Sequence, residues 1–353
     1  MKNSLKEIIY QLPIFWQMVL HKTYHLLSLK GDIKFTVNRL IETFVSEEKQ
    51  KDTEYIDSLK KDICCCFVKY LAKPYEYFLL EFEHKSEEER NEMLTDIVKD
   101  IYCCKYAKIE KQREVSDKFL FYDRMKPYFK REACVVIGES NRKSFIEFTE
   151  KHHRFIAKPN GGSFGQNTNI FNTTEISAEK LFEQLIANGT KWIIEELIIQ
   201  SPEMAEFNPS SVNSVRIPTF RTKLGIVIEG TFMRTGRKGA VVDNAGSGGI
   251  FVKVDENTGE IISDGYTETG ERYKLHPDSL VLFKGFHIPR WKELVKLAKD
   301  CHEVLPDHKY VGWDFALTPK GWVLMEGNWG QFLCQQVSGQ RAYKKRFIEL
   351  MKS

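Results

Sequence analysis

This sequence contains cysteines, but their spacing matches neither a metal site nor a disulfide framework. The eight cysteines include a run at 64–66 and a pair at 103–104, and none forms a C-x-x-C motif. This pattern argues against both a zinc ribbon and a small secreted domain held by disulfides. Reduced thiols in a cytosolic protein are the simplest interpretation, so we expect a cytoplasmic location.

The sequence also lacks long apolar runs and any large excess of one charge. Residues 8–20 are apolar but are interrupted by Gln11, Pro13 and Gln17, so this stretch is too short and too polar to cross a bilayer. We predict a helix packed on the protein's own core, with peripheral membrane contact as the alternative. A net charge of +3 predicts no nucleic-acid partner, although it suits an anionic ligand.

Glycine is absent between Gly31 and Gly138, and apolar residues recur there at helical spacing. Residues 1–115 are therefore predicted to form a helical N-terminal region. Ser86 begins a capping box, ahead of a helix that we expect to carry the apolar residues of 93–101. Nothing in this region indicates chemistry.

After residue 115 helical and strand patterns alternate, which indicates an α+β architecture. We expect two lobes, 116–198 and 199–353. The expected helices are 118–126, 142–152, 177–188 and 291–304. The expected strands are 133–137, 155–159, 192–199, 212–221 and 225–234, followed by hairpins over 251–273.

The strongest local pattern lies at residues 311–329, which predict a β-hairpin. Segments rich in aromatic and aliphatic residues flank Thr318-Pro319-Lys320-Gly321. Proline fixes φ for the first turn position and glycine supplies a positive φ, so we expect a three-residue loop over 319–321. This loop would place Thr318 opposite Trp322 and thereby fix the register of the hairpin.

In this register Asp314 lies opposite Glu326, and Asn328 projects from the same face. Like charges directly opposite each other destabilise a sheet, so this pairing needs a reason. A divalent cation supplies one, because two carboxylates and an amide oxygen suit Mg²⁺ with waters and phosphate oxygens. The alternative, considered on this pattern alone, is a solvated hairpin face whose carboxylates meet lysines.

Further motifs indicate an anionic ligand. Lys158 ends a short strand and directly precedes a glycine-rich turn at 160–165, whose backbone N–H groups could surround phosphate oxygens. Glu195 and Glu196 lie within an apolar strand, which suggests a strand that enters a cleft. Arg216 and Arg234 lie on strands, and a second glycine-rich loop follows at 242–249. Each motif alone is weak.

Their order along the chain is more specific. A lysine at a strand end, a glycine loop, an acidic strand, two arginine-bearing strands, a D-N…G-G loop and a D…E-x-N hairpin together resemble the ATP-grasp superfamily, from about residue 115 onward. Residues 74–78, 86–90 and 208–216 resemble the sugar-transfer-associated and teichuronopeptide-type members, which are encoded with surface-polysaccharide (capsule) biosynthesis. The resemblance implies an ATP-grasp fold in which two lobes grip ATP.

The resemblance also implies roles for particular residues. Those implied to bind ATP are Lys118, Lys158, Gly161, Gly162, Ser163, Gly165, Glu195, Glu196, Leu197 and Ile198. Those implied to act in catalysis are Lys158, Arg216 and Arg234, and those near the substrate are Asn213, Asn244, Gly248 and Gly249. The implied Mg²⁺ ligands are Asp314, Glu326 and Asn328. Gly312 departs from the D-alanine–D-alanine ligase branch, which has an arginine there, so oxyanion stabilisation would fall to Arg216 or Arg234.

The implied activity is that of an ATP- and Mg²⁺-dependent carboxylate–amine ligase, a C–N bond-forming enzyme that acts through an acyl phosphate on small molecules. A sugar acid is one candidate for the carboxylate. The alternatives are a small-molecule kinase on the same scaffold and a non-catalytic nucleotide-binding partner of a glycosyltransferase. The residues identify neither the acid, the amine nor the oligomeric state.

Overall fold

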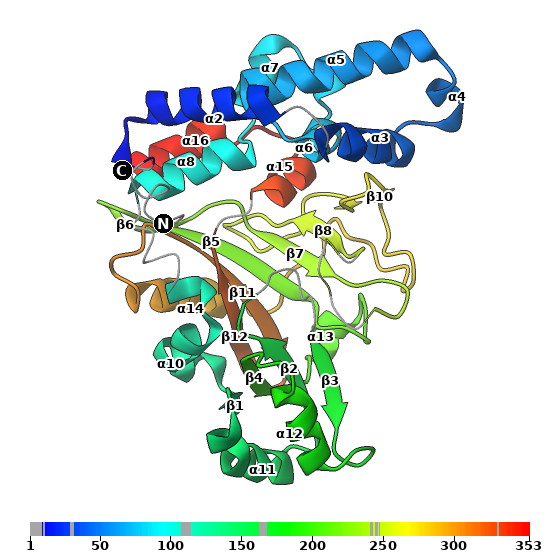
Figure 1. The fold of residues 1–353 in the computed structure, drawn as a ribbon. Helices are drawn as coiled ribbons and strands as arrows, with labels where there is room; N and C mark the ends of the chain where they lie inside the picture. The colour runs from blue at the N-terminus through cyan, green and yellow to red at the C-terminus, as the bar shows by residue number, and fades with distance from the viewer. Residues whose placement is uncertain are drawn as a thin grey trace.

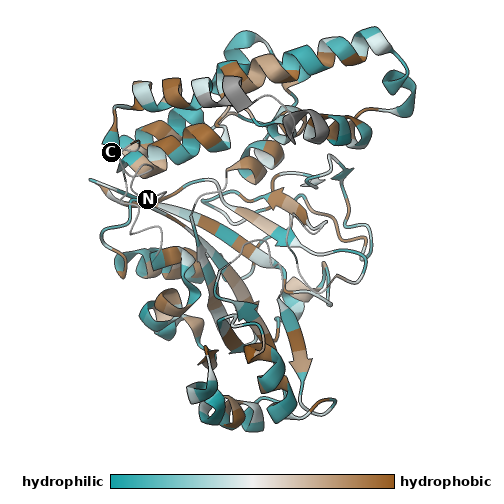
Figure 2. Cartoon of the chain, in the orientation of Figure 1, coloured by the Kyte–Doolittle hydropathy of each residue, from teal (hydrophilic) through white to brown (hydrophobic). Residues whose placement is uncertain are grey.

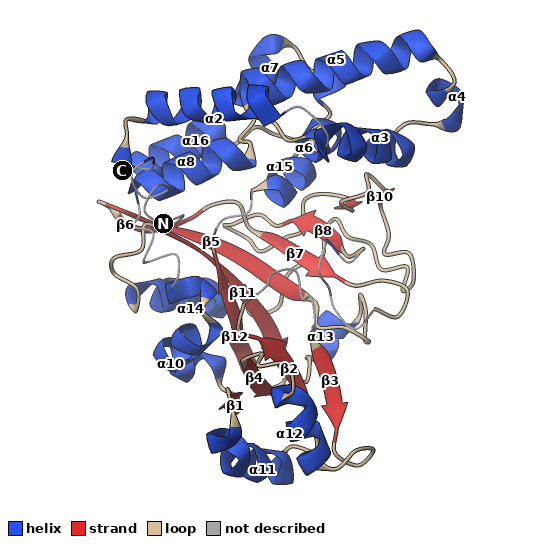
Figure 3. Ribbon diagram, in the orientation of Figure 1, coloured by secondary structure: helices blue, strands red, loops and turns tan. Residues whose placement is uncertain are grey.

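The computed structural model describes residues 9, 11–28, 32–106, 114–161, 168–240, 243, 246, 248–329 and 332–353. Figure 1 shows three parts: a layer of helices, a large sheet beneath it, and a small sheet with its own helices at the far end. In Figure 3 helices cover both sides of the large sheet. The predicted α+β class is confirmed.

The helical layer is built mainly from the N-terminal region. Its elements are α2 (Ile14–Ser28), α3 (Asp32–Phe44), α4 (Glu47–Gln50), α5 (Thr53–Tyr70), α6 (Pro74–Leu79), η1 (Phe82–His84), α7 (Glu87–Glu92) and α8 (Asp96–Tyr106). Two C-terminal helices, α15 (Leu333–Gly339) and α16 (Lys344–Lys352), join it. Phe347 of α16 and Ile101 of α8 lie in one buried cluster, so the C-terminal helices pack on the N-terminal helical region.

The small-sheet lobe contains four antiparallel strands in the order β1-β4-β2-β3. The helix α10 (Lys118–Phe129) precedes this lobe in the chain but packs on the large sheet. The lobe's own elements are β1 (Ala133–Val136), η2 (Glu139–Asn141), α11 (Arg142–Lys151), β2 (Arg154–Pro159), β3 (Asn169–Asn172), α12 (Ala178–Ile186) and β4 (Trp192–Glu196). Phe145 and Phe182, one from each of α11 and α12, pack with Phe155 of β2 in a separate core. This lobe therefore has its own hydrophobic core.

The large-sheet lobe contains an eight-stranded antiparallel sheet, ordered β10-β9-β8-β7-β5-β11-β12, with β6 also paired to β5. Its elements are α13 (Pro202–Ala205), β5 (Ser214–Thr222), β6 (Gly225–Ile228), β7 (Phe232–Thr235), β8 (Ile250–Lys253), β9 (Gly265–Tyr266), β10 (Arg272–Tyr273), α14 (Trp291–Glu303), β11 (Tyr310–Thr318) and β12 (Gly321–Asn328). β5 and β11 are each paired with a strand on either edge, and nearly all of their residues are buried.

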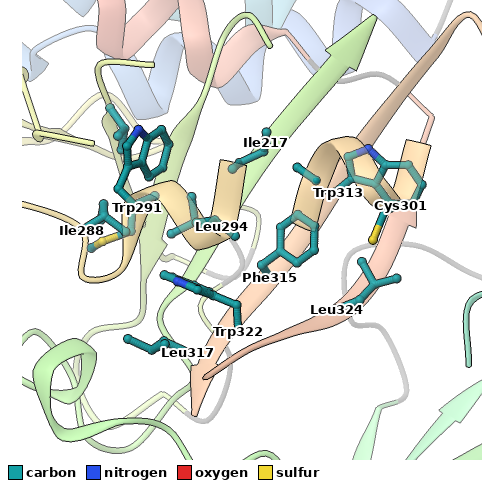
Figure 4. Close-up of a cluster of buried hydrophobic side chains, with 14 of the residues drawn as sticks. Ile217, Ile288, Trp291, Leu294, Cys301, Trp313, Phe315, Leu317, Trp322 and Leu324 are labelled. Atoms are coloured by element: carbon teal, nitrogen blue, oxygen red, sulfur yellow. The ribbon is translucent and has the colours of Figure 1, made fainter. Parts of the chain in front are cut away.

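The two faces of the large sheet bury different side chains because residues alternate along each strand. One face presents Val215, Trp313 and Phe315 to α14 and α10, and Figure 4 shows this cluster. The other face presents Phe220 and Tyr310 to the helical layer. In Figure 2 brown residues recur along the strands and along the helices beside the large sheet, where they alternate with teal ones.

Several expected boundaries were wrong. The strand expected over 225–234 is two strands, β6 and β7, separated where Gly230 takes a φ of 85°. Ser86 does cap a helix, with Glu89 completing the capping box, but α7 ends at Glu92 and the apolar residues beyond it belong to α8. Local cap chemistry therefore predicted the start of this helix but not its length.

Helix α2 occupies the apolar segment near the N-terminus. Ile14 and Met18 pack against the core of the helical layer, whereas Phe15, Trp16 and Leu20 are exposed. The helix thus packs on the protein with one face and leaves apolar side chains on the other. None of the described helices is long and apolar enough to cross a membrane.

Candidate active site

The hairpin of β11 and β12 has the predicted pairing of Asp314 with Glu326, but a different turn produces it. Thr318 pairs with Gly321, not with Trp322, so the loop is one residue shorter than expected. The offset is restored by a bulge between Phe315 and Asp314, where β12 has one extra residue, Met325. The predicted register at the acids is confirmed, and the predicted turn is wrong.

Asp314 is fully buried and is bound by two arginines from neighbouring strands. Arg216, directly opposite on β5, donates to both carboxylate oxygens, with Nη2 at 2.7 Å from Oδ2. Arg234 on β7 donates to Oδ2 at 2.8 Å. Burial alone would raise the pKa of Asp314, but the two guanidinium groups hold that pKa well below its ordinary value. This burial rules out the solvated hairpin face considered above.

Glu326 and Asn328 complete the predicted trio on the same face. The Asn328 amide nitrogen donates to Asp314 Oδ2 at 3.2 Å and to Glu326 Oε1 at 3.1 Å. Burial and the adjacent Asp314 carboxylate raise the pKa of Glu326. The three predicted ligand side chains are therefore brought together within hydrogen-bonding distance.

The donor set fits Mg²⁺ in its chemistry. Two carboxylates and one amide are hard oxygen donors, and half a turn of the Asn328 amide would present its oxygen in place of its nitrogen. A cation would also take the place of the proton that burial favours on Glu326. Among the described residues no three histidine, cysteine, aspartate or glutamate side chains gather as a metal site, so any site here depends on the amide.

Arg234 is held by a second acid on the glycine-rich loop. Its Nε and Nη2 donate to Ser214 Oγ at 3.2 and 3.0 Å. Asp243 accepts from the Ser214 N–H at 2.9 Å and lies 3.8 Å from Arg234 Nε. Burial raises the pKa of Asp243, while Arg234 opposes this rise. Sequence reasoning did not single out Asp243; Asn244, the predicted site residue next to it, lies outside the described residues.

Two glycines pack closely beside these charges. A Cβ at Gly312 would lie 3.3 Å from Arg216 Cδ and 3.2 Å from the Tyr310 hydroxyl oxygen. A Cβ at Gly327, between Glu326 and Asn328, would lie 2.5 Å from the Phe121 ring. The space that a side chain at position 312 would need is thus partly occupied by Arg216.

In the small-sheet lobe Lys158 is bound to Glu195. The Lys158 ammonium donates to both carboxylate oxygens, at 3.0 and 3.1 Å. Arg131, which sequence reasoning missed, binds the same carboxylate, with Nε at 2.9 Å from Oε2. Burial opposes ionisation of Glu195, but the two cations keep its pKa below the ordinary value. Glu196, the last residue of β4, is only half-buried, and its carboxylate oxygen Oε2 accepts from the Glu132 backbone N–H at 3.2 Å.

Lys118 begins α10 and lies near charged groups of both lobes. Its backbone N–H donates to Asn160 Oδ1 at 2.8 Å, which joins the helix to the turn after Lys158. Burial lowers the pKa of Lys118; Glu326 opposes this effect and Lys158 adds to it. Charged groups from both lobes therefore influence the same lysine side chain.

The remaining predicted residues lie on loops or in the buried interior, or fall outside the described residues. Leu197 and Ile198 follow β4 directly, and Gly161 adopts a φ of 132° after β2. Gly248 has a φ of 87° and Gly249 precedes β8. Gly162, Ser163 and Gly165 lie outside the described residues. Asn213 is completely buried, and its amide bonds the carbonyls of Met204 and Asn208, a placement that favours a structural role over substrate contact.

Two separate antiparallel sheets, with charged groups from both acting on one region, are the arrangement expected of an ATP-grasp protein. More particularly, the family model described as "Sugar-transfer associated ATP-grasp" matches residues 98–351. The chain belongs to this family. The match begins inside α8, so most of the N-terminal helical region precedes it.

Similar solved structures include two ligases. Phosphoribosylamine–glycine ligase from Thermotoga maritima is 13% identical, with 62% of this chain and 48% of that protein covered and a TM-score of 0.41. D-alanine–D-alanine ligase from Bacillus anthracis is 12% identical, with 67% of each chain covered and a TM-score of 0.41. The chain thus spans about half the length of the Thermotoga protein. No curated protein matches the sequence at a significant level.

Proposed function

We propose that the protein is an ATP-dependent carboxylate–amine ligase. The observation that carries the proposal is the buried group of Asp314, Glu326 and Asn328, in contact with Arg216 and Arg234. Arginine cannot lose its charge, and these two guanidinium groups lie among three acids, Asp314, Asp243 and Glu326. A cation bound by the acids would offset their charge and leave the guanidinium groups able to attract an anionic ligand. Triphosphate and a substrate carboxylate are such ligands.

ATP would lie between the two lobes. Lys118 and Lys158 would contact its phosphates, with Lys158 exchanging its bond to Glu195 for phosphate oxygens. The backbone of 195–198, at the end of β4, would receive the adenine edge. Mg²⁺ held by Asp314, Glu326 and Asn328 would supply positive charge to the phosphates during transfer.

The reaction would then proceed in two steps. A carboxylate oxygen of the acid forms a bond to the γ-phosphorus as the bond to the bridging oxygen of ADP breaks, which gives an acyl phosphate and ADP. An uncharged amine forms a bond to the carbonyl carbon, phosphate leaves, and the nitrogen loses a proton. Arg216 and Arg234 would offset the charge on the transferred phosphoryl group, which is electrostatic positioning and not covalent catalysis by the protein.

A sugar acid as the carboxylate, in surface-polysaccharide biosynthesis in the cytoplasm, is the finer part of this proposal. Its support is the family description, which associates the chain with sugar transfer.

A phosphate-release screen tests the proposal. The protein is incubated with ATP and Mg²⁺ and a matrix of sugar acids against amines, and ADP and inorganic phosphate are measured together. A ligase forms both products only when acid and amine are present. ADP with a stable phosphorylated product would indicate a kinase instead, and no nucleotide binding or turnover in any combination would overturn the proposal.

A further inference from the structure

Arg131 connects the two lobes through one buried guanidinium. The side chain is only 5% exposed. Nε and Nη2 donate to Glu195, Nη1 donates to the carbonyls of Leu324 at 2.6 Å and Phe129 at 3.2 Å, and Nη2 donates to the carbonyl of Met325 at 3.4 Å. All five N–H donors of the guanidinium are therefore used. No other side chain has five donors in one plane.

The two β12 carbonyls that Arg131 binds belong to the bulge. Leu324 is the last residue paired before the bulge, and Met325 is the extra residue that separates it from Glu326. A bulge leaves backbone groups without partners in the sheet, and buried carbonyls need donors. Arg131 supplies them from the other lobe.

The bulge decides on which face Glu326 lies. In the register near the turn, Phe315 pairs with Leu324, so an uninterrupted ladder would pair Asp314 with Met325. Glu326 would then lie opposite Trp313 and point into the apolar core, because a one-residue slip reverses every side chain. The bulge places Glu326 beside Asp314 and Asn328, where the proposed ligands meet.

We propose that Arg131 is a positioning residue that fixes the bulge of β12 and links it to the Lys158–Glu195 pair. The link to metal ligands and nucleotide rests on the proposed function, whereas the contacts of Arg131 with the bulge do not. Lys158 can leave Glu195 for phosphate while Arg131 still neutralises that carboxylate. The guanidinium thus keeps the register of the proposed metal ligands while the nucleotide enters.

The test compares Arg131→Lys with Lys130→Gln. A lysine has three donors and cannot span Glu195 and both carbonyls, so the bulge should lose its support. Lys130 is a matched control, because its ammonium donates to the carbonyl of Trp322 at 3.2 Å, in the same hairpin but away from the bulge. Hydrogen exchange of peptides covering 321–329, in the absence of nucleotide and metal, is the first measurement.

We expect exchange at 324–326 to rise at least tenfold in Arg131→Lys and to stay at the wild-type level in Lys130→Gln. The second measurement is calorimetric binding of a non-hydrolysable ATP analogue at increasing Mg²⁺. The Mg²⁺ concentration for half-maximal binding should rise about tenfold or more in Arg131→Lys, while melting curves show that the variant remains folded. A general loss of stability would not shift the Mg²⁺ dependence.

The outcomes separate this inference from the proposed function. Unchanged exchange at 324–326 in folded Arg131→Lys would overturn the positioning role, whatever the protein catalyses. Increased exchange with an unchanged Mg²⁺ dependence would overturn the link to the metal ligands. A wild-type protein that binds no ATP analogue at any Mg²⁺ concentration would overturn the proposed function, while the exchange result would still decide the role of Arg131 in the bulge.

Discussion

Two buried carboxylates, one in each lobe, are each bound by two cationic side chains. The two sites differ in the residue types that supply these cations. Asp314 in the large-sheet lobe is bound by two arginines, Arg216 and Arg234. Glu195 in the small-sheet lobe is bound by Arg131 and by a lysine, Lys158. Lys158 is also the most exposed of these four cations, at 16% of its side chain.

This difference indicates which charges are fixed and which can move. A guanidinium bound through several planar donors loses much of its bonding if it shifts, whereas an ammonium is a compact charge on a flexible stem. Removing two charges from water can cost as much as the ion pair returns, so a gain in stability alone does not explain why these pairs are buried. We infer that the large-sheet group is a fixed frame and that Lys158 is the cation that moves to the nucleotide.

Removing the carboxylate of the fixed frame should have the largest effect. Asp314→Ala leaves two buried arginines without their shared partner, which should cost about 3–5 kcal/mol of unfolding free energy and abolish turnover. Urea unfolding and ADP release measure the two effects. Glu326→Gln is the companion variant: it keeps shape and hydrogen bonding, so it should remain stable and still be inactive. Normal ATP-dependent activity in Asp314→Ala would show that the metal assignment is wrong.

Removing the movable cation should have a smaller and more selective effect. In Lys158→Met, Arg131 still neutralises Glu195, so we expect near wild-type stability. Loss of one charge-assisted contact should weaken binding of an ATP analogue roughly 10- to 100-fold. Calorimetry measures this, and Lys180→Met on the exposed side of α12 serves as the control. If Lys158→Met unfolded as readily as Asp314→Ala, the distinction between fixed and movable cations would fail.

The two carboxylate sites also show which features of the fold and the site could be predicted from the sequence. The hairpin itself was predictable because it is local, but the pairing of Asp314 with Glu326 was predicted correctly only because the expected three-residue loop and the actual bulge shift the register by the same one residue. The bulge at Met325 was not, since it depends on carbonyls that Arg131 satisfies from almost two hundred residues away in sequence. Arg131 itself has no local signal. The break at Gly230 was missed because 225–234 has the composition of one continuous strand.

The buried carboxylates and a buried histidine on the apolar face of the large sheet should lose their contributions to stability in different pH ranges. His302 of α14 is buried there, with Nε2 at 2.8 Å from the carbonyl oxygen of His308 and Nδ1 at 2.6 Å from Thr219 Oγ1. Burial lowers the pKa of His302 from 6.5 to about 4, although the bond to His308 opposes this, so the ring is neutral in the folded protein at neutral pH.

The sign follows from the protons bound by each state. Between pH 6.5 and 4 the unfolded chain protonates this histidine and the folded chain does not, so stability is lost as the pH falls through this window. The full loss is about 3 kcal/mol. Asp314 and Glu195 have lowered pKa values, and their contribution is lost only below the ordinary carboxyl range. Urea unfolding of His302→Gln should therefore show a flatter slope from pH 6.5 to 4 than the wild type or the control His153→Gln. An unchanged slope would assign this acid sensitivity to other groups.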